Sequence, residues 1–378
     1  MNRILICTYA AGYGHHKASE AIREALLAAG PETEVRIFDP LHHGRPYLST
    51  LLVHGYLRLL KRAPWIYRNL YTRAEAVKQE GRAGIGFGLL WKTVLNRTFW
   101  LRLDMFMQEF RPGAVICTHP FAAVAISAWK KRKQVKIPAI TGVITDFTIH
   151  PFWPQSDLDG YFVSSPELAE IMAETGVPGE RIWVVGIPVG SRFGRTLNRN
   201  LIKLKLGLDP HKTTVLVTGG GLGLGGLKEA VEALGTLETP IQIMAVTGLN
   251  PVLQQSLERV IRDLGNPVKV FSFVDNMADL MRASDIIVSK PGGITVAEAL
   301  VTGKPVVIWK PLPGQEERNS SFLVRHSLAR LAGDLQSLAA VVKELAGQEV
   351  SIAGRGPAVL HASAARSIVG IINKTYMD

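Results

Sequence analysis

KPGGITVAEALVTGKPVVIWKPLPGQEERN, residues 290–319, decides the fold of this chain. It follows the apolar run 286–288, passes through two glycines, takes a helical pattern over residues 295–300 and returns to a strand-like run at 305–309. A polar loop with Gln315, Glu316 and Asn319 is expected to close the stretch. Strand, glycine turn, helix and strand in this order form a βαβ unit, which can hold a phosphate at its helix N-terminus.

The residues of the turn suit an anionic ligand. Gly292 and Gly293 let backbone N–H groups approach an anion with no Cβ in the way. Thr295 adds a hydroxyl in the first helical turn, and Glu298, one turn on, can accept two hydrogen bonds from a ribose diol. The alternative is an ordinary strand-to-helix turn with Glu298 as a solvated helix residue.

The whole stretch resembles the C-terminal half of the inverting UDP-sugar transferases that include the monogalactosyl- and glucosyl-diacylglycerol synthases. Their relative is the N-acetylglucosaminyl transferase of peptidoglycan lipid synthesis. The resemblance implies that Gly292, Gly293 and Thr295 lie at the diphosphate and that Glu298 holds the uridine ribose. It also implies that the hexose hydroxyls are held by Gln315, Glu316 and Asn319.

A second motif opens the chain, where a strand ending at residue 8 leads through a glycine-containing loop into a helix. Its Gly12-x-Gly14-His15, followed by Ala18, is similar to the family's GxGHxxA element, which selects His15 and not His16 and places Gly14 at the donor. Inverting sugar transfer needs a base that takes the proton of the acceptor hydroxyl. A helix N-terminus disfavours the imidazolium and keeps such a ring neutral. Alternatively, His15 satisfies a loop carbonyl or positions the phosphates without moving a proton.

A third motif, TDF-x-x-H-x-x-W at residues 145–153, ends the fourth expected strand. Ligands of parallel sheets bind at the carboxyl ends of the strands. The pattern resembles the lipid glycosyltransferases more closely than the peptidoglycan enzyme and favours a glycerolipid acceptor. Asp146 is either the base itself or the group that orients His15. His150 and Trp153 are expected to shape the acceptor pocket; the alternative is a capped turn with a buried Trp.

Two further elements are expected at the donor. The run GGGLGLGG at residues 219–226 places Gly220 and Gly221 where backbone N–H groups can face the diphosphate; simple flexibility is the alternative. Residues 273–277 resemble the family's uracil-binding turn, with Phe273 and Met277 at the base unless they only pack in the core. Family members commonly place an Arg near the nucleotide after Gly-Ile-Pro and an aliphatic residue. Here that position is Gly190, and Arg192 two residues later is left unassigned.

No metal and no cofactor are expected. Asp157-x-Asp159 looks like the DxD of the other major glycosyltransferase fold, but it lies in a loop before a strand in a different architecture. Glycine N–H groups and a helix N-terminus can meet the phosphate charge instead. The sequence has no His/Cys cluster that would suggest another metal site.

The charge of the chain is one-sided. Residues 1–150 hold 21 Lys and Arg against 10 Asp and Glu, whereas residues 151–378 hold 22 of each. Basic residues beside Trp and Tyr at 45–111 suit an anionic bilayer surface, unless the Leu stripe there is core and the charges are a solvated face. The expected membrane-contact residues are Tyr56, Arg58, Lys61, Arg62 and Trp65. No nucleic acid partner is expected, because no recognised fold signature accompanies the charge.

Length and composition predict two folded α/β domains. The chain has 378 residues, 47% hydrophobic and 20% charged. Expected strands at 3–8, 34–38, 114–117, 139–144 and 160–163, then at 214–217, 241–246, 268–271, 286–288 and 306–309, alternate with helices and predict parallel sheets. Cys7 and Cys117 lie in apolar runs and are expected as buried free thiols in a reducing cytoplasm. Neither a signal peptide nor a membrane span is expected.

The resemblance extends this to two Rossmann-like domains facing across a cleft, the GT-B architecture. Residues 1–190 would form the acceptor and membrane-docking domain and residues 191–357 the UDP-sugar domain, with a helix at about 358–376 packing back on the first. The implied enzyme is cytoplasmic and docks at the inner face of the cell membrane. It moves glucose or galactose from the UDP-sugar to 1,2-diacylglycerol, with repeated transfer left open. The alternatives are N-acetylglucosamine transfer to a polyprenyl-linked precursor, UDP-sugar 2-epimerisation and a non-catalytic nucleotide-sugar sensor.

Overall fold

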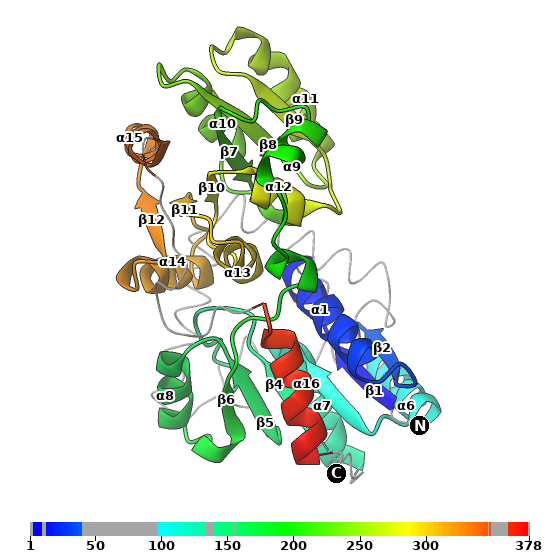
Figure 1. The fold of residues 1–378 in the computed structure, drawn as a ribbon. Helices are drawn as coiled ribbons and strands as arrows, with labels where there is room; N and C mark the ends of the chain where they lie inside the picture. Colours follow the sequence, from blue (N-terminus) through cyan, green and yellow to red (C-terminus); the bar gives the residue numbers. More distant parts are fainter. Residues whose placement is uncertain are drawn as a thin grey trace. The chain divides into compact units, whose positions relative to one another are not determined.

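The computed structural model describes residues 3–9, 13–39, 97–133, 139–154, 156–346, 348 and 362–376. The chain divides into two compact units, drawn in Figure 1. The first unit comprises Met1–Pro188, Pro313–Gln315 and Ser363–Asp378, and the second comprises Val189–Leu312 and Glu316–Ala362.

The first unit is built on a six-stranded parallel sheet in the order β2-β1-β3-β4-β5-β6. Its strands are β1 (Arg3–Cys7), β2 (Glu34–Phe38), β3 (Ala114–Cys117), β4 (Ala139–Val143), β5 (Gly160–Val163) and β6 (Ile182–Val184). The central strands β3, β4 and β5 are buried at every residue, as expected for a parallel sheet covered on both faces. Cys7 and Cys117 are buried free thiols, as their position in apolar runs predicted.

In the described part of the first unit, the helices are α1 (Tyr13–Ala29), α6 (Arg97–Phe110), α7 (Pro120–Lys133), α8 (Pro166–Glu174) and α16 (Ala364–Tyr376). Although α16 ends the chain, it packs against α1 (Figure 1). Ile368 and Ile372 of α16 share a core cluster with Ile4 of β1 and Ile22 of α1. The hydroxyl of Tyr376 donates to the Asp159 carbonyl at 2.9 Å. The last helix is therefore part of the first unit's core.

The second unit carries another six-stranded parallel sheet, in the order β12-β11-β10-β7-β8-β9. Its strands are β7 (Thr213–Thr218), β8 (Ile241–Val246), β9 (Val268–Phe271), β10 (Ile286–Ser289), β11 (Val306–Trp309) and β12 (Ala329–Ala332). Its helices are α9 (Arg199–Lys205), α10 (Leu227–Gly235), α11 (Pro251–Val260), α12 (Met277–Ala283), α13 (Gly293–Val301), α14 (Gln315–Arg325) and α15 (Leu335–Ala346). The predicted α/β class with parallel sheets is confirmed.

One local expectation was wrong. The polar stretch expected as a loop at 315–319 is the beginning of helix α14. The loop ends earlier, at Gly314, whose φ of 87° is left-handed. Gln and Glu are good helix formers, and Glu316 and Glu317 in the first turn complement the positive end of the helix dipole.

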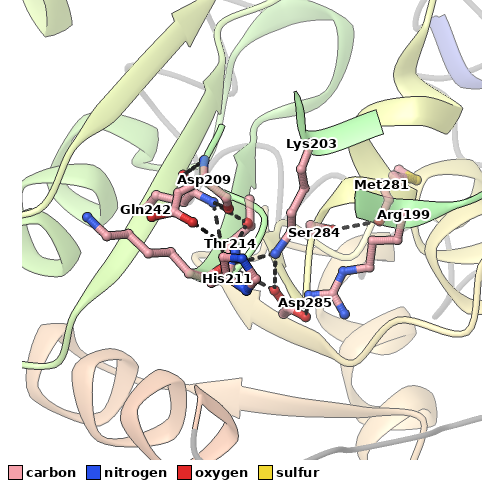
Figure 2. Close-up of polar contacts among 10 residues, drawn as sticks. Arg199, Lys203, Asp209, His211, Thr214, Gln242, Met281, Ser284 and Asp285 are labelled. Atoms are coloured by element: carbon pink, nitrogen blue, oxygen red, sulfur yellow. Dashed lines mark hydrogen bonds and ion pairs between the residues drawn. The ribbon is translucent and has the colours of Figure 1, made fainter. Parts of the chain in front are cut away.

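A polar network ties together the amino ends of strands in the second unit (Figure 2). The Asp285 carboxylate accepts from the Thr214 N–H at 2.8 Å and from the Lys203 ammonium at 3.3 Å, and it also pairs with Arg199. The Lys203 side chain, only 1% exposed, also donates to the Lys212 carbonyl at 2.8 Å. Asp285 is therefore the counter-ion of a buried lysine that docks α9 on the sheet.

Candidate active site

The His15 ring is held where three strands of the first sheet end. His15 lies in the first turn of α1, Thr118 follows β3 and Thr145 follows β4. Its Nδ1 is 2.9 Å from the Thr118 carbonyl oxygen and 2.8 Å from the Thr145 hydroxyl. Because a carbonyl oxygen only accepts, Nδ1 carries the proton of the neutral ring. The Nε2 atom is then the proton acceptor, as a general base requires.

Buried hydroxyls hold the backbone around this ring. Ser19, one turn along α1, donates from Oγ to the His15 carbonyl at 2.9 Å. The same Oγ is 3.0 Å from the Thr118 hydroxyl. Both side chains are fully buried, so the start of α1 and the end of β3 are fixed to one another.

The surroundings keep His15 neutral. Burial lowers its pKa below the usual value, while the Asp146 carboxylate and the Thr118 hydrogen bond act in the opposite direction. Desolvation thus adds to the helix N-terminus as a reason for a neutral ring. The Asp146 backbone is held in turn, because its carbonyl accepts from Ser164 Oγ at 3.0 Å. A carboxylate at this position favours the protonated form of the His15 ring.

His119 is a member of the site that sequence reasoning missed. Its ring centroid is 4.5 Å from that of His15, edge to face. Its Nδ1 accepts from the Phe121 N–H at 3.1 Å, so the neutral ring carries its proton on Nε2. Burial, followed by the charges of His15 and His150, lowers its pKa well below the usual value. The available signal was its position directly after a buried strand, the rule that selected Asp146.

His150 joins the same group through aromatic contacts. Its Nδ1 accepts from the Phe152 N–H at 3.3 Å, and its ring centroid is 6.0 Å from that of Phe121. Burial, with a smaller effect of His15, lowers its pKa to about 4. We call His15, His119 and His150 the histidine cluster: one ring offers an acceptor nitrogen, and two offer N–H donors.

Trp153 supports this cluster from the interior. The ring is buried and lies against Gly142 of β4, where a methyl group would come within 2.8 Å of it. The Trp153 backbone N–H donates to the His150 carbonyl at 3.0 Å. Trp153 therefore shapes the turn that carries His150.

Gly14 and His16, the neighbours of His15 in sequence, also lie in α1. Gly14 precedes His15 in the first turn of α1. His16 points to a different partner, with its Nε2 3.4 Å from the Glu20 carboxylate, and its side chain is 45% exposed. The structure thus brings His15, not His16, to the ends of the strands.

In the second unit, the loop 219–226 has a backbone that only glycine adopts easily. Gly220, Gly223, Gly225 and Gly226 have φ of 69°, 61°, 89° and 66°. A methyl group at Gly223 would lie 2.3 Å from the Thr247 carbonyl oxygen. The loop is also anchored, since the Gly226 carbonyl accepts from the Trp309 indole N–H at 2.9 Å. Gly221 accepts from the Leu249 N–H, also at 2.9 Å.

The second glycine turn begins helix α13. Gly292 is its N-cap and no side chain caps it, so the first N–H groups of the helix are left as donors. Thr295 and Glu298 lie on α13, and Glu298 is buried. Asn319 of α14 is fully buried, and its Nδ2–H donates to the Pro291 carbonyl at 3.1 Å. Asn319 therefore ties α14 to the turn.

Lys290, which the sequence interpretation did not select, stands between the two glycine elements. Its ammonium forms an ion pair with Oε1 of Glu316, and the two side chains are 18% and 14% exposed. The other oxygen of Glu316 accepts from the Leu312 N–H at 2.9 Å. Gln315, the residue before, begins α14.

Arg192 contacts the turn at residues 273–277, which was predicted to bind uracil. Phe273 is 39% exposed, and Met277 begins α12. The Arg192 guanidinium donates to the Asp275 carbonyl within this turn. The unassigned Arg192 thus holds the turn through its backbone.

Neither Asp of the DxD-like segment stands alone. Asp157 pairs with Lys131 at 3.4 Å. Asp159 accepts from the Ile140 N–H at 2.8 Å and pairs with Lys130 at 3.4 Å. Within the described residues, no group of three or more His, Cys, Asp or Glu side chains is arranged to hold a metal ion. A reaction without metal remains a prediction.

The expected membrane-contact residues, Tyr56, Arg58, Lys61, Arg62 and Trp65, lie outside the described residues. In the part of the chain that is described, no helix has the length and apolar character needed to cross a bilayer.

Two α/β units, each built on a parallel six-stranded sheet, are typical of the GT-B class, to which solved structures also point. MurG of Acinetobacter baumannii gives a TM-score of 0.63 at 15% identity, covering 99% of this chain and 100% of that one. The sucrose-phosphate synthase of Thermosynechococcus elongatus gives 0.62 at 13% identity, covering 100% and 99%. At such identities the likeness concerns the fold, and the predicted GT-B architecture is confirmed.

The family follows from the sequence relatives. Residues 15–189 match the monogalactosyldiacylglycerol (MGDG) synthase family, and residues 214–346 match the glycosyltransferase family 28 C-terminal domain. A processive diacylglycerol beta-glucosyltransferase of Bacillus cereus (strain B4264) is 30% identical over 351 residues, covering 93% of this chain and 87% of the relative. The equally named protein of Bacillus anthracis (strain A0248) is 30% identical over 333 residues, covering 88% and 82%. The chain belongs to the monogalactosyl- and glucosyl-diacylglycerol synthase family of glycosyltransferases.

Proposed function

We propose that this enzyme transfers a hexose from a UDP-sugar to 1,2-diacylglycerol with inversion at the anomeric carbon, and that His15 is the general base. The observation that carries the proposal is the anchoring of His15 Nδ1 on the Thr118 carbonyl, which leaves Nε2 to accept a proton. The names of the relatives support diacylglycerol as acceptor, glucose as hexose and repeated transfer.

The proposed reaction is a single displacement. The free hydroxyl of diacylglycerol gives its proton to His15 Nε2, and its oxygen attacks the anomeric carbon from the face opposite the diphosphate. As the new glycosidic bond forms, the bond to UDP breaks and UDP leaves with the electron pair. The Asp146 charge, which raises the pKa of His15, stabilises the imidazolium at that moment.

The donor is assigned to the second unit. Five residues are proposed at the diphosphate: Gly220, Gly221, Gly292, Gly293 and Thr295. Their support is the uncapped start of α13 and the left-handed glycine loop. We further propose that Glu298 holds the ribose, that Phe273 and Met277 contact uracil, and that the hexose is held from α14. The hexose residues are Gln315, Glu316 and Asn319.

The acceptor is assigned to the first unit, with His150 and Trp153 beside the base. We propose that the basic face of residues 45–111 docks on the cytoplasmic face of an anionic membrane. In the described part of that face, Leu101 and Met105 on α6 are 53% and 68% exposed, and the Arg132 guanidinium lies 5.7 Å above the Trp100 ring. Apolar and cationic groups side by side suit a bilayer interface.

The test is label transfer by the purified protein from radiolabelled UDP-glucose or UDP-galactose. Anionic vesicles with dioleoylglycerol are compared with vesicles that carry a polyprenyl-linked precursor, and with no lipid. We expect organic-extractable label with dioleoylglycerol only, and the donor that supplies it identifies the sugar. Label moving only from UDP-N-acetylglucosamine to the polyprenyl lipid, or a UDP-sugar epimer formed without lipid, would refute the assignment.

A further inference from the structure

Glycines of both loops border the Lys290 side chain. A methyl group at Gly220 would be 3.6 Å from its Cε, one at Gly225 3.3 Å from its Cβ, and one at Gly292 3.6 Å from its Nζ. Three glycine positions therefore border the stem and the ammonium. No Cβ at these positions separates the charge of Lys290 from the two loops assigned to the diphosphate.

The Lys290 ammonium is paired with the Glu316 carboxylate. The Lys290–Glu316 pair is largely buried, and removing one partner of such a pair leaves an uncompensated buried charge. A second lysine borders the glycine loop, but Lys310 pairs outward with Glu229 at 3.0 Å and is 46% exposed. Of these two lysines, Lys290 is the more buried one and the one bordered by glycines of both loops.

The reaction creates a need for such a cation. Negative charge grows on the leaving UDP as the bond to the hexose breaks, and preorganised positive groups at that position lower the barrier. Backbone N–H groups supply only partial charges. A lysine ammonium adds a full charge without a metal.

We propose that Lys290 binds the donor diphosphate and the leaving UDP, and that Glu316 holds its ammonium until the donor arrives. The diphosphate then replaces Glu316 Oε1 at the lysine. The released Oε1 accepts from a hexose hydroxyl, while Oε2 stays on the Leu312 N–H. This inference rests on the proposed UDP-sugar donor.

The exchange predicts that two substitutions affect UDP affinity differently. Lys290→Met removes the cation, and UDP affinity falls about tenfold to hundredfold, as for a lost hydrogen bond to a charged group. Uridine affinity is unchanged, because uridine has no phosphate. Glu316→Gln removes the competing carboxylate, so UDP binds as tightly as in the wild type or about twofold to tenfold tighter, while transfer slows.

The experiment is calorimetric titration of uridine, UMP and UDP into wild type and variants. Lys343→Met, an exposed position on α15, is the control that loses the same charge. Unchanged uridine affinity shows that Lys290→Met is folded. Should this variant not fold, UDP titration of Lys290→Arg and Glu316→Gln replaces it. For Lys290→Arg we expect a UDP affinity within about tenfold of the wild type.

The outcomes are separable. A wild type that does not bind UDP overturns both the donor assignment and the role of Lys290. Wild type that binds UDP, with Lys290→Met binding equally well, overturns the role of Lys290 alone. The role of Lys290 is also overturned if Lys290→Met loses affinity for uridine and for UDP to the same extent. A loss of UDP affinity in Glu316→Gln overturns the exchange.

Discussion

Replacing His15 separates its chemical role from its structural one. His15→Ala removes the Nε2 base and also leaves the Thr118 carbonyl and the Thr145 hydroxyl without their 2.9 Å and 2.8 Å contacts. His15→Asn removes the base too, but its Nδ2–H occupies the place of Nδ1–H and can still donate to Thr118. The two variants should therefore share a catalytic defect and differ in stability.

The magnitudes follow from these contacts. Loss of a general base slows transfer about 10²–10⁴-fold, which is about 3–5 kcal/mol in the barrier. Unpaired groups at the end of β3 and β4 cost His15→Ala about 1–3 kcal/mol of folding free energy. For His15→Asn we expect a loss smaller by about 1 kcal/mol, because the hydrogen bond that is kept contributes about that much.

The assay is label transfer to dioleoylglycerol, with urea unfolding and UDP titration on the same preparations. His16→Ala is the matched control, since His16 makes only a half-exposed pair with Glu20, and its transfer rate should stay within about twofold. In the wild type, kcat/KM should be level at neutral pH and fall at acid pH, below the ordinary range of a histidine, because burial lowers the pKa of His15. Equal transfer by His15→Asn and wild type, or equal loss of UDP affinity and transfer, would refute the base assignment.

Three further predictions concern stability. Asp285→Ala leaves the buried Lys203 without its counter-ion and should cost about 3–5 kcal/mol in urea unfolding, while the exposed Asp263→Ala costs little; equal stabilities would contradict this. Ile368→Ala cuts into the core shared by α1 and α16 and should cost about 2–5 kcal/mol, and an unchanged melting temperature would argue against that packing. Since the pKa of His150 is lowered to about 4, the unfolded chain takes up its proton first, and stability should fall as pH drops from about 6.5 to 4. His150→Gln should flatten that decline in melting temperature, and an equally steep decline would contradict it.

The sequence predicted strands well where they are buried at every residue. Runs such as 114–117 and 286–288 are apolar throughout and lie between turn signals. Strands β6 and β12 were missed because they are short and half exposed: Ile182–Val184 has no fully buried residue, and Ala329–Ala332 has two exposed ones. Their positions at the sheet edges come from pairing with a neighbour, which local periodicity does not reveal.

At the site, local motifs located residues but not their partners. The GxGH pattern selected His15, yet its proton position depends on Thr118, which lies 103 residues away in sequence. His119 was missed because its significance appears only when the ends of β1, β3 and β4 come together. Lys290 was missed for the same reason, since Glu316 and the glycine loop are distant in sequence.

The most direct measurement is proton NMR of the glycolipid that the wild type makes from a UDP-α-hexose and dioleoylglycerol vesicles. A single displacement assisted by His15 inverts the anomeric carbon, so the account predicts a β-linked hexosyl-diacylglycerol. An α-linked product, or no glycolipid from a preparation that binds UDP, would contradict it.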